Sequence, residues 1–482
     1  MTVAVRETLE RELKFTVPES FTLPELPGEA LDPRVFTSTY YDTEPRALAA
    51  GGITLRWRVE NGRGLWQLKF PRGHARLELE RPGGPLAPPP ELQELLPAVL
   101  EGGKLEAVAT LRTRRHAYVV RDGERAVAEV AQDSVAALEG LHVTNSFEEL
   151  EVELLEGTED ELRDIERALV AAGAERSDGR PKVFRVIGGA PVAADDKPPL
   201  GPAHEGLRAF FAAQHAELLE HDPGTRLGSD PEELHDFRVA TRRLRSVLRS
   251  AGPLLAPDWS VSLRDELAWL GDCLGAVRDL DVFNGYLRDE ITRLEPEEQA
   301  AAGALLEALA AEREAAREGM LEALRSERYL ALLRRLEEAG RAPQTVPADL
   351  TLPEVAAQEF RRLRRAMRAF EADGSDEELH RARIRGKRGR YAAELAGPKA
   401  GKREKRFVER AKAFQDVIGE HQDAVVAEAR IRELLTKADG GELTAFAAGR
   451  LVEHQRARRR EARQAVPQAW RRLEQSGRRA WS

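Results

Sequence analysis

The sequence predicts an α+β protein of two domains, an antiparallel sheet or barrel followed by an all-α bundle. Three observations lead to this fold class. Before about residue 200, short stretches alternate polar and apolar residues between Gly and Pro, whereas long patterns of helical period follow. The charge balance changes at the same point, from 25 basic and 35 acidic side chains to 49 and 48. The helical part also contains an internal repeat.

The composition is that of a folded chain with more than one core. The protein has 482 residues, a formal net charge of −9, 42% hydrophobic and 33% charged residues, which excludes a disordered chain. No apolar run approaches the roughly 20 residues that span a bilayer, and the first residues lack the apolar core of a signal peptide. Cys273 is the single cysteine, which excludes a disulfide framework and a thiolate metal cluster. We therefore expect a cytoplasmic protein without a membrane partner.

The first domain is expected to span residues 1–190. It should end with a helix at Asp160–Ala172, where apolar residues recur at helical spacing and a glycine follows. A segment rich in Pro, Ala and Asp predicts a linker at residues 191–203. The expected strands share period-two alternation and are Leu9–Phe15, Gly52–Val59, Leu65–Phe70, Arg76–Glu80, Ala107–Val120, Ala126–Val135 and Ser146–Leu155.

The second domain, residues 204–482, is expected to be a duplicated helical bundle. Its two repeats, at about 204–340 and 353–475, are separated by a Pro-containing break. Leu234–Arg245 matches Leu379–Arg390 at an offset of 145 residues. A second match, at an offset of 144 residues, pairs LGAVRDLDV with IGEHQDAVV. Two matches at nearly one offset predict internal pseudo-twofold symmetry.

Charged residues follow the strand period in the first domain. Glu10, Glu12 and Lys14 form an E-x-E-x-K pattern and share one face of the first strand. A solvated face would explain such a pattern in any single strand. Nearly every strand repeats it, however, and this favours a barrel with an ionic lumen and an apolar exterior. Clustered carboxylates favour Mg²⁺ or Mn²⁺, and clustered Arg and Lys favour phosphates, so the pattern predicts a metal–polyphosphate site.

Over residues 5–188 the motifs occur in the order of a known family. E-x-E-x-K is followed by YYDT, LRWR, LK, an RTR strand, ELEVEL and a late lysine. The set resembles the CYTH superfamily of triphosphate tunnel metalloenzymes. The resemblance implies an antiparallel eight-stranded β-tunnel, dependence on Mg²⁺ or Mn²⁺, and action on a triphosphate.

The resemblance also implies roles for individual residues. Lys14 is a candidate catalytic residue, and Tyr40 or Tyr41 is a candidate for positioning the attacking water. Glu129 and Glu149 are second choices as ligands, since an exposed acidic face explains them equally well. The implied metal ligands are Glu10, Glu12, Asp133, Glu151 and Glu153. The implied triphosphate-binding residues are Lys14, Arg56, Arg58, Lys69, Arg112, Arg114 and Lys182.

The helical domain carries two basic rows, one in each repeat. His235 and the arginines after it recur at helical spacing, and His380 begins the same pattern in the second repeat, up to Glu394. A solvated basic face is the simpler explanation, but few acids neutralise the rows and both repeats retain them. A groove for a long polyanion explains both facts. The acids Asp279 and Asp423 occupy equivalent positions, where each is expected to brace an arginine.

Residues 200–475 resemble the CHAD domain, a helical bundle with a repeated L-H-x-x-R helix. The sequence departs from that pattern at Gly389 and Ile418. The resemblance implies binding of inorganic polyphosphate, and the lack of interleaved aromatic residues argues against nucleic acid. The implied polyphosphate-binding residues are His235, Arg238, Arg242, Arg243, Arg245, Arg249, His380, Arg383, Lys387, Arg388, Arg390 and His421.

The order of the two domains resembles bacterial CYTH–CHAD proteins. The leading hypothesis is a metal-dependent hydrolase of the inorganic triphosphatase type, acting on triphosphate or short phosphate chains while the helical domain binds polyphosphate. The second is a non-enzymatic protein that binds polyphosphate or is targeted to polyphosphate granules. An adenylyl cyclase or an organic triphosphatase ranks last, because no base-recognition pocket is identified. The sequence leaves the substrate, the metal and the oligomeric state open.

Overall fold

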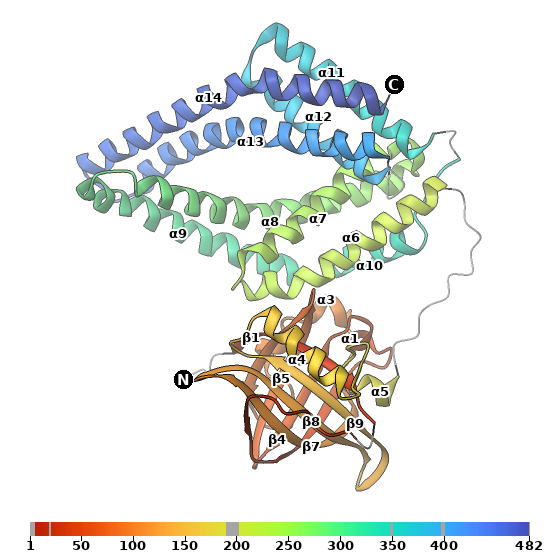
Figure 1. The fold of residues 1–482 in the computed structure, drawn as a ribbon. Coiled ribbons are helices and arrows are strands. Elements are labelled where there is room, and N and C mark those ends of the chain that lie inside the picture. Colours follow the sequence, from red (N-terminus) through yellow and green to blue (C-terminus); the bar gives the residue numbers. More distant parts are fainter. Residues whose placement is uncertain (1–4, 19–20, 189–201, 348–349, 397–400, 482) are drawn as a thin grey trace. The chain divides into compact units, whose positions relative to one another are not determined.

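The computed structural model describes residues 5–18, 21–188, 202–347, 350–396 and 401–481. The chain divides into two compact units, Met1–Ala194 and Asp195–Ser482, the first built on a barrel and the second helical (Figure 1). Most of the predicted linker at 191–203 lies outside the described residues, and the first helix of the second unit begins at Pro202.

The first unit is a closed antiparallel barrel of eight strands, which confirms the predicted fold class. In spatial order β1, β6, β5, β4, β3, β7, β8 and β9 are neighbours, and β1 also pairs with β9, which closes the barrel. Two short strands, β2 (Gly28–Ala30) and β10 (Glu175–Arg176), pair with β7 and β1. The barrel strands are β1 (Arg6–Thr16), β3 (Arg34–Asp42), β4 (Thr54–Glu60), β5 (Arg63–Arg72), β6 (Ala75–Pro82), β7 (Glu106–Asp122), β8 (Arg125–Glu139) and β9 (His142–Leu154).

All seven predicted strands are present, and β3 is the barrel strand that the sequence pattern did not indicate. Its residues, RVFTSTYYD, carry charge only at the two ends of the strand, so no charge alternation revealed it. The predicted helix is α4 (Glu159–Ala171), which begins with a capping box between Thr158 and Glu161. The remaining helices of the unit are short: α1 (Ala47–Ala50), α2 (Pro90–Gln93), α3 (Pro97–Leu100) and α5 (Phe184–Ile187).

The barrel keeps its main apolar core on its outer surface. Leu13 and Phe15 of β1 and Val152 of β9 pack there against Leu162 and Leu169 of α4. Each such side chain contributes roughly 1.5–3 kcal/mol on full burial. Because the apolar positions face outward to the helix, the alternate positions of the same strands face the lumen.

The second unit consists of long helices in two similar sets. Gly389, one of the positions where the sequence departs from the CHAD pattern, lies inside helix α12, and the helix continues through it without a break. Helices α8, α9, α13 and α14 pack around one apolar cluster that mixes both repeats. None of the described helices combines the length and apolar character needed to cross a bilayer. The helices are α6 (Pro202–Leu227), α7 (Pro231–Ser250), η1 (Gly252–Leu254), α8 (Pro257–Ile291), α9 (Pro296–Arg325), α10 (Glu327–Arg341), α11 (Leu352–Asp373), α12 (Asp376–Leu395), α13 (Lys402–Lys437) and α14 (Glu442–Ala480).

Candidate functional sites

The barrel lumen contains a cavity of about 270 Å³ whose lining is charged on nearly every strand. Residues directly opposite each other on paired strands share a face. Glu151 lies opposite Lys14, and Arg76 lies opposite Glu10, so the lumen-facing set runs from strand to strand around the barrel. Ten predicted residues line the cavity: Glu10, Glu12, Lys14, Tyr40, Arg56, Arg58, Lys69, Glu151, Glu153 and Lys182.

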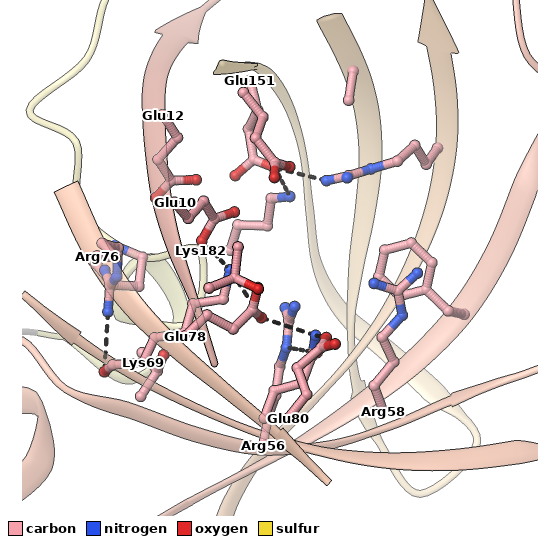
Figure 2. A pocket seen from close by; sticks show the side chains of 18 of the residues that line it. Glu10, Glu12, Arg56, Arg58, Lys69, Arg76, Glu78, Glu80, Glu151 and Lys182 are labelled. Atoms are coloured by element: carbon pink, nitrogen blue, oxygen red, sulfur yellow. Dashed lines mark hydrogen bonds and ion pairs between the residues drawn. The ribbon is translucent and has the colours of Figure 1, made fainter. Parts of the chain in front are cut away.

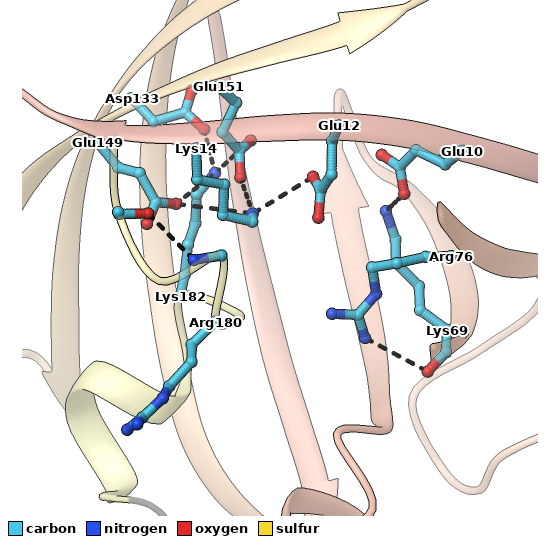
Figure 3. Close-up of polar contacts among 12 residues, drawn as sticks. Glu10, Glu12, Lys14, Lys69, Arg76, Asp133, Glu149, Glu151, Arg180 and Lys182 are labelled. Carbon is cyan, nitrogen blue, oxygen red and sulfur yellow. Dashed lines mark hydrogen bonds and ion pairs between the residues drawn. The ribbon is translucent and has the colours of Figure 1, made fainter. Parts of the chain in front are cut away.

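One half of the lumen holds a compact network in which Lys14, Lys182 and Arg115 surround the carboxylates of Asp133 and Glu151; Figure 3 shows the two lysines and the two carboxylates. Lys14 contacts Glu151, and Lys182 contacts Asp133 and lies 2.8 Å from Glu151. Arg115 donates to both Asp133 oxygens at 2.8 and 2.7 Å and to Glu151 at 2.6 Å. Asp133 is fully buried behind the cavity wall, so these cations supply the charge that its burial requires.

The other half of the lumen is lined by side chains of β3, β4, β5 and β6; Figure 2 shows Arg56, Lys69 and Glu78 among them. Lys69 contacts Glu10 and lies 3.3 Å from Glu78. Arg56 donates through Nε to Gln67 at 2.8 Å and through Nη1 to the Tyr40 hydroxyl at 3.1 Å. These contacts hold the guanidinium group toward the cavity, where it can meet an anion.

Burial and neighbouring charges shift several pKa values in the lumen. Burial opposes the charge of Lys14, but the carboxylates of Glu151 and Glu12 outweigh it and raise the pKa of that lysine. Burial raises the pKa of Glu153 to about 7, and the neighbouring Glu10 carboxylate adds to the effect. Burial likewise raises the pKa of Glu149 to about 7 against the opposing effect of Lys14. A cation bound among these carboxyls would therefore displace protons near neutral pH.

The carboxylates of the tunnel match a hard divalent cation in type, because they supply oxygen ligands alone. Glu12 and Glu153 lie directly opposite each other on β1 and β9, and Glu10 precedes Glu12 by two positions on the same face. Within the described ranges, no three His, Cys, Asp or Glu side chains are already gathered as a metal site. Lys69 contacts Glu10, and Lys14 lies 3.3 Å from Glu12, so lysines neutralise these two carboxylates.

Three predicted residues are placed outside the lumen, which corrects their assignment. Thr113 lies opposite Phe36, which lines the cavity, so Arg112 and Arg114 of the same strand face outward and are exposed. Tyr41 also faces away from the lumen, and its ring lies 5.0 Å from that of Trp66. Strand β7 carries basic residues in both registers, so the alternation could not assign the face.

Four arginines that line the cavity were not among the predicted site residues: Arg6, Arg34, Arg76 and Arg115. Arg115 and Arg34 line the cavity, and each contacts a carboxylate of β8, Asp133 for the first and Glu129 for the second. Arg115 lies directly opposite Asp133. Knowing which β7 residue lies opposite the predicted ligand Asp133 of β8 would have identified Arg115 as a lumen residue.

One end of the lumen is closed by the segment that follows α4. Lys182 and the residue before it line the cavity. Val183 and Phe184 then pack against Leu111 and Val135, which lie in the lumen-facing register of β7 and β8. At the other end, Arg6 lines the cavity with a side chain that is 76% exposed. The lumen is thus a pocket with one mouth.

In the second unit, the two basic rows come together where α7 packs against α12. Arg242 of α7 donates through Nε to the Tyr391 hydroxyl of α12 at 2.9 Å. We call Arg238, Arg242, Arg383 and Lys387 the central row. Burial, followed by the charges of Arg383 and Arg242, lowers the pKa of Lys387 to about 8.

The two acids expected to brace the rows do so in both repeats. Arg238 donates to Asp279 at 2.6 and 3.3 Å, and its counterpart Arg383 lies 3.9 Å from Asp423. The bracing explains why the motif that contains each acid repeats with the basic helix.

The other predicted basic residues surround the central row, with one exception. His235 lies 3.4 Å from Arg278, and His380 lies 3.1 Å from Gln422. His421 is 2% exposed and lies 3.2 Å from Asp376 at the start of α12, so its assignment to the polyanion surface is corrected. The remaining predicted residues are partly or fully exposed on α7 and α12: Arg243, Arg245, Arg249, Arg388 and Arg390.

These features define a class of two-unit protein in which a tunnel barrel with an ionic lumen is joined to a duplicated helical domain with paired basic helices. Residues 8–178 match the CYTH domain, and residues 209–432 match the CHAD domain. The chain therefore belongs to the family of CYTH–CHAD proteins.

The chain is similar to other proteins over different parts of its length. The uncharacterized protein Rv2226 of Mycobacterium tuberculosis is 30% identical over 512 residues, covering 98% of each chain. The structure of PptA from Streptomyces chartreusis is 26% identical with a TM-score of 0.50, and covers 56% of this chain and 100% of its own. The structure of the CHAD domain from the plant Ricinus communis is 29% identical with a TM-score of 0.44, and covers 56% of this chain and 91% of its own.

Proposed function

We propose that the barrel hydrolyses inorganic triphosphate or short phosphate chains with the help of Mg²⁺ or Mn²⁺. The observation that supports this most is the composition of the cavity, in which carboxylates and cations line one space of about 270 Å³. Carboxylates alone would suit a cation, and cations alone would suit an anion. Both together suit a metal-bound phosphate chain.

The proposed roles follow from position in the lumen. Glu10, Glu12 and Glu153 would hold the metal, which when bound neutralises phosphate charge and activates water. Arg56, supported by Tyr40, would hold a phosphoryl group with its free guanidinium edge. The basic residues proposed to bind the triphosphate are Lys14, Arg56, Arg58, Lys69 and Lys182, with Arg34 and Arg115 added by the structure.

The helical unit is proposed to bind polyphosphate on the surface around the central row. Four cations from two helices gather there, and burial, followed by the repulsion from Arg383 and Arg242, lowers the pKa of Lys387. A polyanion would remove that repulsion. In this account the helical unit recruits long phosphate chains, and the barrel acts on chain ends or on free triphosphate.

The test is phosphate release from triphosphate by the full-length protein. With Mg²⁺ or Mn²⁺ release should be readily measured, and Glu10→Gln or Glu12→Gln should reduce it by at least about 100-fold, because each change removes a proposed ligand. Glu7→Gln is the matched control, since Glu7 is exposed on the same strand. Equal rates for the control and the lumen variants would refute the proposal.

A second function is favoured by one observation. Lys14, Lys182 and Arg115 already neutralise Glu151 and Asp133, so this half of the lumen is electrostatically satisfied by its own side chains. A non-enzymatic polyphosphate-binding or granule-targeting protein needs no more than that. It predicts polyphosphate binding that survives Glu10→Gln and is lost when the central row is neutralised.

A further inference from the structure

The two repeats of the helical unit allow a position-by-position comparison around α7 and α12. The offset of 145 residues also aligns α6 with α11. Their buried residues coincide under it, Leu207, Phe211, Gln214 and Leu218 corresponding to Leu352, Ala356, Glu359 and Leu363. Each contact made by one repeat therefore has a counterpart whose residues can be named.

One such contact is attractive in one repeat, whereas its counterpart in the other repeat is repulsive. Arg243 of α7 lies 3.9 Å from Glu394 of α12. Under the offset, Arg243 corresponds to Arg388, and Glu394 corresponds to Arg249. An attractive pair on the first-repeat side is thus replaced by two arginines on the second-repeat side.

The neighbouring positions change in the same direction. Glu217 of α6 corresponds to Arg362 of α11, and Ala240 corresponds to Arg385. The acid at Glu359 replaces Gln214, and it contacts Arg362. The net formal charge is −1 over Gln214, Glu217, Ala240, Arg243 and Glu394, and +3 over Glu359, Arg362, Arg385, Arg388 and Arg249.

The arginines of the second-repeat side are not balanced by other carboxylates. Among the described residues, no carboxylate lies within 4.0 Å of Arg249, Arg385 or Arg388. Burial, followed by the charges of Arg249 and Arg385, lowers the pKa of Arg388 to about 10. These guanidinium groups are therefore close enough to repel one another, and an anion would relieve that repulsion.

We propose that Arg249, Arg362, Arg385 and Arg388, here called the arginine cluster, form an additional phosphate-binding site that exists on the second-repeat side alone. Arg249 is the last member of the basic row of α7, so the cluster adjoins that row at its C-terminal end. A phosphate chain bound along the central row would then continue onto the arginine cluster. Guanidinium groups suit this task because they bind phosphate oxygens in pairs. The inference rests on the proposed polyphosphate binding of the helical unit.

An arginine of the same helix outside the proposed binding surface supplies the matched control: Arg381 of α12 is exposed and pairs with Glu377 and Glu378. Full-length protein is titrated calorimetrically with polyphosphate chains of defined length, comparing Arg388→Gln with Arg381→Gln. We expect Arg388→Gln to weaken binding of long chains by about tenfold and to lower the salt slope by roughly one, whereas Arg381→Gln changes affinity by less than about twofold. Arg388→Lys keeps the charge but loses the paired donors of the guanidinium group, so its affinity should lie between those of the wild type and Arg388→Gln.

Thermal unfolding without polyphosphate separates binding from folding. Arg388→Gln removes like-charge repulsion, so its melting temperature should equal or exceed that of the wild type. A lowered melting temperature together with weak binding would overturn the proposal, because the arginine would then serve the fold. Equal losses of affinity for the two variants would overturn the proposed role of the arginine cluster, but not the proposed polyphosphate binding of the helical unit. No polyphosphate binding by the wild type would overturn the proposed function of the helical unit as well.

Discussion

Arg115 donates two hydrogen bonds to Asp133, at 2.8 and 2.7 Å, across the paired strands β7 and β8. Asp133 has no exposed surface, and burial opposes its charge, but Arg115 and Lys182 outweigh that effect and lower its pKa. The pair fixes one wall of the lumen and determines which register of β7 faces inward.

Arg115→Gln should destabilise the protein by about 3–5 kcal/mol, because it leaves a buried carboxylate with too little compensating charge. Arg114→Gln, one position away on the exposed face, should change stability by no more than about 0.5 kcal/mol. Urea unfolding followed by circular dichroism measures both. A similar small change in the two variants would contradict the structural role of the pair.

Tyr40 and Tyr41 should differ in activity although they are adjacent. Tyr40→Phe removes the hydroxyl that accepts from Arg56 at 3.1 Å, and should lower kcat/KM for triphosphate by about tenfold, as expected for a hydrogen bond to a charged group. Tyr41→Phe should have no effect, since that side chain faces away from the lumen. Steady-state phosphate release measures both, and an equal loss in the two variants would contradict the proposed positioning of Arg56.

Polyphosphate of defined length should be shortened from its ends. The lumen has one mouth, near Arg6, and its other end is closed by Lys182 and the apolar residues after it, so a chain cannot thread through the barrel. Gel electrophoresis should show orthophosphate or short products beside the full-length chain at early times. Fragments from the middle of the chain at those times would contradict the closed end.

Polyphosphate affinity should fall as the pH rises from about 7 to 9. The pKa of Lys387 is lowered to about 8 by burial and by Arg383 and Arg242, with Asp423 opposing and Arg238 adding to the effect. The lysine is therefore charged below this pKa and loses its charge above it. A bound polyanion favours the charged form and moves the transition upward. Lys387→Arg should bind with little dependence on pH over this range, and an equal pH dependence in that variant would exclude Lys387 as the titrating group.

The sequence predicted the fold and much of the lumen because strand alternation is a local property. Glu10, Glu12 and Lys14 face the cavity, as their spacing indicates. Alternation did not predict which face of β7 lines the lumen, because Arg112 and Arg114 lie on one face and Arg115 on the other. The pairing of Arg115 with Asp133 determines the lumen face.

Contacts between distant segments were beyond the sequence pattern. His421 follows a repeated motif, but its ring turns into the core toward Asp376. The contrast between Arg243 and Arg388 depends on Glu394 and Arg249, which belong to the opposite helix in each case. The sequence shows that the second row ends at Glu394 where the first has Arg249. The packing of α7 on α12 shows what this difference means, because Glu394 pairs with Arg243 of the opposite helix.

The most direct test of the account is a substrate panel with purified full-length protein. Phosphate release is measured from triphosphate, ATP, thiamine triphosphate and long polyphosphate, each with Mg²⁺, with Mn²⁺ and with a chelator. We expect the fastest release from inorganic triphosphate, dependent on the metal and abolished by Glu12→Gln. No release from any of these substrates with either metal would contradict the proposed hydrolysis.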